Sequence, residues 1–81
     1  MKELSDNSLF ILKNCLKKRK PAWLATVETI NKVKHEMKFY NELRQIVGDE
    51  LIEEGFNGDY QPNEYGLKLE KLIDELGKNL C

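Results

Sequence analysis

Apolar residues follow a helical spacing through the first twenty residues of the chain. The positions that share one face are Leu9, Leu12 and Leu16. Ser5 or Asp6 can cap the start of a helix here, because both side chains accept hydrogen bonds from the first turn. Pro21 forbids simple continuation of the helix. The pattern therefore predicts a first helix that begins after Ser5 or Asp6 and ends before Pro21.

Two further apolar stripes lie between Pro21 and Gly55. The first consists of Trp23, Val27, Ile30, Val33 and Met37, and the second of Phe39, Tyr40, Leu43, Ile46, Val47 and Leu51. At about 100° per residue, the second stripe is rotated by roughly a third of a turn from the first. We expect a kink or short break near Lys38. No Gly or Pro lies near that point, so one long helix over 21–54 that changes packing partners stays open as the alternative.

The rest of the chain predicts one loop and one more helix. Residues 55–62 form the loop, and Gly55 is a natural stop for the helix before it. A last amphipathic helix is expected from Asn63, with Tyr65, Leu69, Leu72, Ile73, Leu76 and Leu80 on its apolar face. Leu67 falls opposite that face, where it would pack on the loop or meet a partner. The 81 residues thus predict a single all-α domain over 1–81, a bundle of three to four helices.

The net charge of −1 conceals an asymmetry along the chain. Residues 1–48 carry ten Lys or Arg against five Asp or Glu, and residues 49–81 carry three against nine. Such a chain can present a basic face to one partner and an acidic face to another. The basic run of residues 17–20 beside Trp23 has the residue types that contact nucleic acids, but a pI of about 5.8 argues against a general nucleic-acid binder.

Cysteine usage and hydropathy indicate where the protein works. No stretch of apolar residues is long enough to span a membrane, and the N-terminus shows no secretory signal. The two cysteines, Cys15 and Cys81, do not make a disulfide framework. Cys15 lies in an amphipathic segment and is expected in the core as a small apolar residue. We therefore expect a protein of the reducing cytoplasm with no membrane partner.

The residue types required for catalysis or metal binding do not come together in this sequence. His35 is the only histidine, and its charged neighbours predict a surface position on a helix. No cysteine or second histidine lies close enough in sequence to complete a zinc site, and neither cysteine has a base to activate it. Residues 59–70 have the length of a calcium loop, but Glu64 replaces the glycine needed at the sixth position. We therefore predict no enzyme, no metal and no cofactor.

The acidic residues around the 55–62 loop are the best candidates for a binding surface. They are Asp49, Glu50, Glu53, Glu54, Asp59 and Glu64, and they flank the aromatic residues Phe56 and Tyr60. Aromatic anchors ringed by charge are a frequent arrangement at interfaces, and negative charge speeds the encounter with a cationic partner. The pattern predicts that this region binds a protein, such as a nuclease or another cationic toxin domain.

Residues 64–76 carry a motif that points to one family. Their sequence, Glu-Tyr-Gly-Leu-Lys-Leu-Glu-Lys-Leu-Ile-Asp-Glu-Leu, resembles the Glu-x-Gly-Leu-Ala-Leu-Glu-x-Leu-Cys-Asp-x-Leu stretch of small bacterial immunity proteins of the MafI and contact-dependent growth inhibition types. Lys68 stands where alanine is usual, and Ile73 where cysteine is common. The resemblance covers 13 of 81 residues. It implies an all-helical cytoplasmic protein that neutralises a toxin by binding it directly.

Two other functions are compatible with the pattern. The segment from Leu51 to Leu67 is similar in layout to the helix–wing–helix ending of winged-helix DNA-binding regulators. Its first helix is acidic, however, and would repel phosphates. A helical subunit or adaptor of a larger complex is the second alternative. The sequence favours the immunity protein over both.

Overall fold

The structure is a computed structural model, and it describes residues 4–33, 35–58 and 61–78. Its elements are α1 (Asp6–Arg19), the 3-10 helix η1 (Pro21–Trp23), the short α2 (Leu24–Val27), α3 (Met37–Glu54) and α4 (Glu64–Gly77). Within these described ranges, β pairing is limited to a single bridge between Phe56 and Pro62. The all-α class and the predicted number of helices are therefore confirmed.

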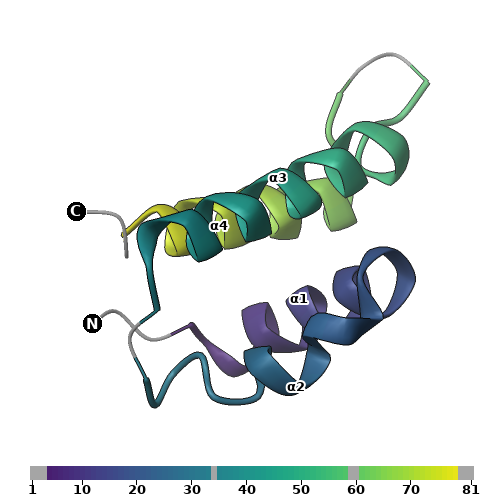
Figure 1. Ribbon diagram of the computed structural model, residues 1–81. Coiled ribbons are helices and arrows are strands. Elements are labelled where there is room, and N and C mark those ends of the chain that lie inside the picture. Colours follow the sequence, from purple (N-terminus) through teal and green to yellow (C-terminus); the bar gives the residue numbers. More distant parts are fainter. Residues whose placement is uncertain (1–3, 34, 59–60, 79–81) are drawn as a thin grey trace.

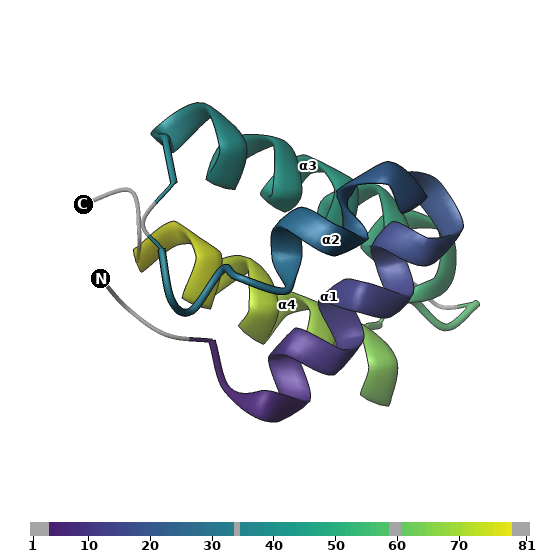
Figure 2. The ribbon, with the colours of Figure 1, turned by 60° about the horizontal axis from the view of Figure 1, so that its bottom comes forward.

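The helices form two layers (Figures 1 and 2). α3 and α4 lie side by side in one layer, and α1, η1 and α2 make up the other. The buried apolar side chains of the core are Leu4, Ile11, Leu12, Cys15, Leu16, Val27, Ile30, Tyr40, Leu43, Val47, Leu69, Leu72 and Leu76. α1 contacts both α3 and α4, so its apolar face closes the bundle. The prediction that Cys15 is a core residue is confirmed.

α1 begins and ends where the sequence predicts. The Ser5 hydroxyl accepts a hydrogen bond of 3.2 Å from the backbone N–H of Ser8, which satisfies one of the free donors of the first turn. Pro21 begins η1 directly after α1. The cations of the last turn are Lys17, Lys18 and Arg19. They lie at the negative end of the helix dipole, which stabilises the C-terminus of α1.

The chain leaves the helical path after Val27 and re-enters it at Met37. Residues 28–32 form successive turns. The alternative of one long helix over 21–54 is therefore wrong. The helix is interrupted, as expected, but the interruption begins before Lys38 and spans more residues than a kink would. β-branched residues, which lose side-chain freedom in a helix, are frequent where the helix stops: Thr26, Val27, Thr29 and Ile30.

Asn31 ties this break to the N-terminal segment. Its Oδ1 accepts a hydrogen bond of 2.8 Å from the backbone N–H of Leu4, and its Nδ2 donates to the Leu4 carbonyl oxygen at 3.0 Å. Ile30, next to it, is buried in the core. The turns thus have tertiary contacts of their own, which compensate for the helix that does not continue.

His35 does not occupy the predicted position. It lies between the turns and α3 rather than on a helix, and its side chain is half-buried. Its ring packs against Phe39 with the centroids 4.5 Å apart, and its backbone N–H donates to the Tyr40 hydroxyl at 3.3 Å. His35 therefore belongs to an aromatic cluster with Trp23, Phe39 and Tyr40, and the expectation of a helical surface histidine was wrong.

The end of α3 and the start of α4 come into backbone contact at two glycines. Gly55 ends α3 as predicted, and Asn63 caps α4 by accepting a hydrogen bond of 2.7 Å from the backbone N–H of Gly66. A Cβ atom on Gly66 would overlap the carbonyl group of Gly55. The turn therefore needs glycine at position 66, because the two backbones touch there.

Candidate functional site

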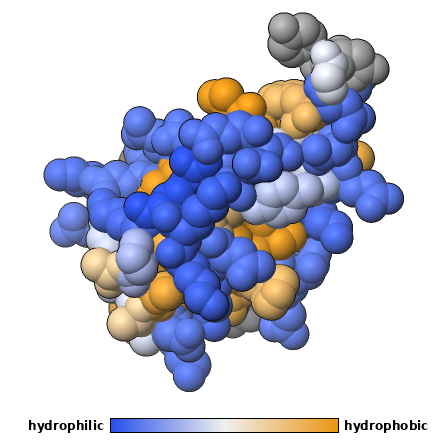
Figure 3. All heavy atoms as spheres, turned by 90° about the vertical axis from the view of Figure 1, so that its right-hand side faces the viewer, coloured by the Kyte–Doolittle hydropathy of each residue, from blue (hydrophilic) through white to orange (hydrophobic). Residues whose placement is uncertain are grey.

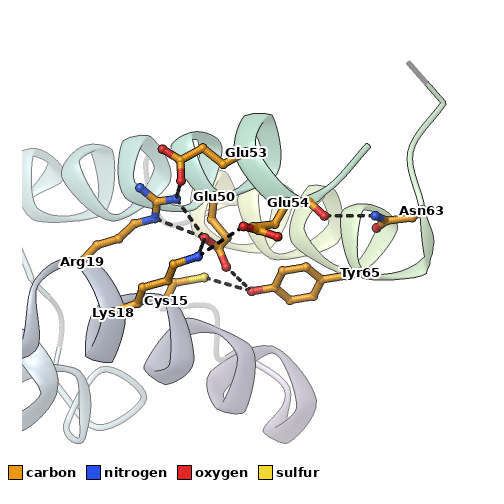
Figure 4. A network of polar contacts seen from close by, with 8 residues as sticks. All are labelled: Cys15, Lys18, Arg19, Glu50, Glu53, Glu54, Asn63 and Tyr65. Atoms are coloured by element: carbon orange, nitrogen blue, oxygen red, sulfur yellow. Dashed lines mark hydrogen bonds and ion pairs between the residues drawn. The ribbon is translucent and has the colours of Figure 1, made fainter. Parts of the chain in front are cut away.

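Glu50, which the sequence placed on the acidic surface, lies inside the bundle. Its side chain is 6% exposed and projects from α3 toward the end of α1 (Figure 4). Its Oε1 accepts hydrogen bonds from Lys18 Nζ at 3.1 Å and from Arg19 Nη2 at 2.9 Å. A buried carboxylate needs such partners, because an isolated charge in the interior is costly. Glu50 therefore joins α1 to α3, and the expectation that it faces a partner is corrected.

The second carboxylate oxygen of Glu50 is bonded as well. The Tyr65 hydroxyl of α4 donates to Oε2 at 2.8 Å, and the Cys15 sulfur lies 3.8 Å from that hydroxyl. We call this cluster the Glu50 network, with the members Cys15, Lys18, Arg19, Glu50 and Tyr65 (Figure 4). Three helices meet at one carboxylate, so the network determines how α1 sits on the α3–α4 pair.

The register of α3 contains the signal that predicts the burial of Glu50. Leu43 and Val47 are fully buried on one stripe, and Glu50 occupies the next position of that stripe, three residues after Val47. Tyr65 lies on the apolar face of α4, where a buried hydroxyl requires a polar partner. Its charge alone predicts that Glu50 lies on the surface, whereas its position in the helical repeat of α3 predicts that it lies in the core.

The surroundings change the pKa values in the Glu50 network in different directions. Burial alone would raise the pKa of Glu50, but the hydrogen bonds from its three partners outweigh that effect and hold the pKa below the ordinary 4.5. Burial, followed by the hydrogen bond to Glu50, raises the pKa of Tyr65 far above its usual 10. Burial also raises the pKa of the Cys15 thiol. At neutral pH the network therefore contains a carboxylate, two cations, a neutral phenol and a neutral thiol.

The depressed pKa of Glu50 predicts a loss of stability in acid. A carboxyl group with a lower pKa in the folded state stabilises the fold above its unfolded pKa, and this contribution disappears as the pH falls through the folded value. We expect the free energy of unfolding, measured with urea at a series of pH values, to fall below about pH 4.5. The Glu50→Gln variant, which cannot titrate at this position, should have a shallower acid slope. Equal slopes in the two proteins would mean that Glu50 is not the group responsible.

Glu53 and Glu54 are exposed, but cations of α1 balance their charges. Glu53 Oε2 lies 2.7 Å from Arg19 Nη2, and Glu54 Oε1 lies 3.7 Å from Lys18 Nζ. The basic end of α1 thus faces the acidic end of α3. Some of the basic residues of the first half of the chain and the acidic residues of the second half therefore pair with each other. Their charges are not available to an external partner.

The predicted acidic residues that keep an unpaired charge are Asp49 and Glu64. Both are exposed, and neither forms an ion pair with another residue in the described ranges. Phe56, between them in sequence, is 39% exposed. Asp59 and Tyr60 lie outside the described residues. Asp49, Phe56 and Glu64 are thus the predicted site residues that the structure leaves accessible at the α3–α4 turn.

Two exposed apolar side chains extend this surface. Ile52, which the sequence did not single out, is 73% exposed one helical turn before Phe56, and Leu67 is 55% exposed next to Gly66. Apolar atoms interrupt the polar surface beside the loop in Figure 3. Both residues lie off the apolar stripe of their helix, which is the signal by which they can be found. We call this set the turn surface: Asp49, Ile52, Phe56, Glu64 and Leu67.

A metal-binding group and a membrane-spanning helix are both absent from the described part of the chain. Within residues 4–33, 35–58 and 61–78, no group of three His, Cys, Asp or Glu side chains could hold a metal ion. No helix in those ranges is long and apolar enough to cross a bilayer. Comparisons with family models, with curated proteins and with solved structures find no match to this chain.

Proposed function

We propose that the protein binds another protein through the turn surface and acts as a cytoplasmic immunity protein that neutralises a bacterial toxin domain. The observation that carries this proposal is the exposure of Ile52, Phe56 and Leu67 beside two unpaired carboxylates. Of the six large apolar side chains that are exposed in the described residues, three lie within a few residues of the α3–α4 turn, and exposed apolar residues that gather on one surface mark a contact surface. The resemblance of residues 64–76 to immunity proteins supports the choice of partner.

The chemistry of the turn surface suits a cationic partner. The apolar side chains can bury area at the centre of an interface, where most of the binding free energy arises. Asp49 and Glu64 have no internal partner, so their charge is available to steer and orient a basic protein. A toxin that acts on nucleic acid carries a basic active site, because it must bind phosphates. A one-to-one complex would cover that site.

The DNA-binding alternative has less support. A winged-helix domain has a β-hairpin after its recognition helix, and the described residues between α3 and α4 contain one β bridge only. In the basic run, Lys18 and Arg19 bind Glu50, and Lys20 lies 3.8 Å above the Trp23 ring. These cations are engaged within the molecule. The adaptor alternative would use the same turn surface, and only the identity of the partner separates it from the immunity role.

Immunity proteins of the type that residues 64–76 resemble are encoded beside their toxin, so co-expression with the product of the neighbouring gene tests the proposal. We expect a one-to-one complex in size-exclusion chromatography with light scattering, and restored growth of cells that produce the toxin. A stable complex with a protein that is not toxic would indicate an adaptor. Absence of a complex, together with binding to DNA that weakens steeply as salt rises, would favour the regulator.

Reversing the two unpaired charges of the turn surface should weaken the complex without changing stability. For the Asp49→Lys/Glu64→Lys variant we expect affinity to fall by about tenfold or more, which corresponds to about 1.4 kcal/mol. The matched control is Asp6→Lys/Asp74→Lys, which makes the same change in net charge at two other exposed positions. Isothermal titration calorimetry measures the affinity of both variants for the partner. Equal affinities for the two variants would exclude the turn surface as the contact.

A further inference from the structure

The layer formed by α3 and α4 has helices on one face only. α1, η1 and α2 lie on that face, and within the described ranges no helix lies on the opposite one (Figure 1). Glu50 points to the covered face, because its carboxylate binds cations of α1. Two residues turn a helix by about 200°, so Gly48 and Ile52 point to the uncovered face. We call this face the outer face, and its members that matter below are Arg44, Gly48, Ile52, Leu67 and Asp74.

α4 contributes one apolar and one charged residue to the outer face. The Tyr65 hydroxyl lies 3.8 Å from the sulfur of Cys15 on α1, so Leu67, two residues later, points away from α1. Asp74 follows seven residues after Leu67 and lies on the same stripe. Leu67 is 55% exposed, and Ile52 of α3 is 73% exposed. In Figure 3, which has the same vertical direction as Figure 1, apolar atoms are exposed at the top, along the edge of this face. The outer face thus exposes apolar area that the bundle does not bury.

No contact within one copy of the chain explains Arg44 and Gly48. They precede Ile52 by eight and four residues, so the three residues share one stripe of α3. The Nε of Arg44 is buried without a hydrogen-bond partner in the described ranges, and its guanidinium forms no ion pair there. Gly48 lies inside the helix at a cost of about 1 kcal/mol, although nothing is within 4 Å of the place that its Cβ would take. An unsatisfied donor and a gap in the row of side chains both favour a close contact from outside.

The close contacts between α3 and α4 fix the register of this antiparallel pair. Gly55 touches Gly66 near the turn, and the guanidinium carbon of Arg44 lies 3.6 Å from the place that a Cβ atom on Gly77 would take. Each step toward the N-terminus of α3 therefore corresponds to one step toward the C-terminus of α4. It follows that Ile52 lies level with the first turns of α4, and Arg44 level with its last turn.

A two-fold axis along the groove between α3 and α4 makes the outer face complementary to itself. Such an axis places α3 of one copy over α4 of the other at the same level. Ile52 then meets Leu67 of the second copy, and the guanidinium of Arg44 meets the carboxylate of Asp74. Asp74 is exposed and forms no ion pair in the described ranges, so its charge is free for this contact. Each contact occurs twice, and opposite charges at matched positions favour a second copy over a partner of one charge sign.

We propose that the outer face associates with the outer face of a second copy of this chain to form a symmetric dimer. The face is about 21 Å long, from the 14 residues of α4, and about 20 Å wide, from two helix diameters. The dimer therefore buries on the order of 1,000 Å² in total, which is less than stable interfaces bury. Glu70 lies on α4 between Leu67 and Asp74 and has no cation opposite it, which weakens the pair. We expect a dissociation constant on the order of 0.1 mM.

The dimer and the turn surface share Ile52 and Leu67. A second copy and a toxin domain would therefore compete for these side chains, and the toxin would displace the weakly held copy to give a one-to-one complex. This competition rests on the proposed function, whereas the dimer itself does not. In a dilute titration the chain is mostly monomeric, so Asp74 still serves as a control position for toxin binding.

Sedimentation equilibrium of the protein alone, with a thiol reductant present, tests the dimer. Over a concentration series that spans the expected dissociation constant, the average mass should rise from 9.5 kDa toward twice that value. Arg44→Glu and Asp74→Lys should each weaken association at least about tenfold, because each brings like charges together. Asp6→Lys makes the same charge change as Asp74→Lys on α1 and should associate as the wild type does. Circular dichroism verifies that each variant is folded.

An equimolar mixture of Arg44→Glu and Asp74→Lys is the decisive sample. In a mixed dimer both contacts again join opposite charges, so the mixture should associate about as strongly as the wild type, although neither variant does so alone. A wild-type mass that stays at 9.5 kDa, or a mixture of folded variants that does not recover association, would overturn the proposal.

The dimer and the proposed function can fail independently. Association is measured without a partner, so its absence removes the dimer and leaves toxin binding untouched. If the mixture recovers association but no toxin complex forms, the dimer stands and the immunity role fails. A toxin complex that retains two copies of this chain would overturn the competition between them.

Discussion

Replacing Glu50 by lysine is expected to remove a large part of the protein's free energy of unfolding. The variant would place a third cation beside Lys18 and Arg19 in the interior, where the Glu50 side chain is 6% exposed. It would also remove the carboxylate that accepts the hydrogen bond of the Tyr65 hydroxyl. Removing one partner of a buried ion pair costs about 3–5 kcal/mol. A domain of 81 residues has a total stability of only about 4–12 kcal/mol. Urea denaturation followed by circular dichroism should show the loss directly.

Glu53→Lys is the matched control for this experiment. Glu53 carries the same charge on the same helix and also binds Arg19, but its side chain is 58% exposed. Exposed ion pairs contribute little, so we expect a change below about 1 kcal/mol. Glu50→Gln keeps the shape of the side chain and should lie between the two. If Glu50→Lys and Glu53→Lys unfold at the same urea concentration, the Glu50 network does not hold the helices together.

Gly66→Ala is expected to destabilise the protein by about 2–3 kcal/mol, although alanine is intrinsically the better helix former. The added Cβ would overlap the Gly55 carbonyl group, and backbone atoms cannot rotate away as the end of a flexible side chain can. α3 and α4 would have to separate at the turn. A fall in melting temperature of about 10 °C or more should follow for a domain of this size.

The control for this substitution is Gly48→Ala on the neighbouring helix. Nothing lies within 4 Å of the position that a Cβ atom on Gly48 would occupy. Only helix propensity acts there, so this variant should be more stable than the wild type by up to about 1 kcal/mol. Replacing glycine by alanine is thus expected to lower the stability of the protein at position 66 and to raise it at position 48. Stabilisation by Gly66→Ala would mean that the helices do not touch at the turn.

Both ends of α1, the end of α3 and the start of α4 were predictable because each is set by a local signal. Ser5 and Asn63 cap the helices that follow them, Pro21 follows the first helix, and Gly55 stops α3. The apolar stripes also identified most of the core, including Cys15. These features depend on neighbours in sequence, which is why hydrophobic spacing and capping chemistry were sufficient.

The break after Val27 and the position of Glu50 depend on contacts between distant residues. Asn31 bonds to Leu4, 27 residues away, and no local signal marks that pair. Glu50 is buried only because Lys18 and Arg19 arrive from another helix to neutralise it. Identifying it from sequence would require reading the helical register of α3 together with the basic end of α1.

This structure assigns separate roles to acidic residues that look alike in sequence. Glu50 stabilises the bundle, Glu53 and Glu54 are balanced by α1, and Asp49 and Glu64 remain available at the surface. Stability and binding should therefore respond to different substitutions. A triple charge reversal that included Glu50 would confuse the two effects, because loss of binding could follow from unfolding.

Calorimetric titration of the neighbouring gene product into folded Glu50→Gln and folded Asp49→Lys/Glu64→Lys tests this account most directly. We expect the Glu50→Gln variant, although less stable, to bind with nearly wild-type affinity in a one-to-one complex. The Asp49→Lys/Glu64→Lys variant should keep its stability and lose about tenfold or more in affinity. The opposite result, with binding weakened by Glu50→Gln and unchanged by the reversal of Asp49 and Glu64, would contradict the assignment of the turn surface as the contact.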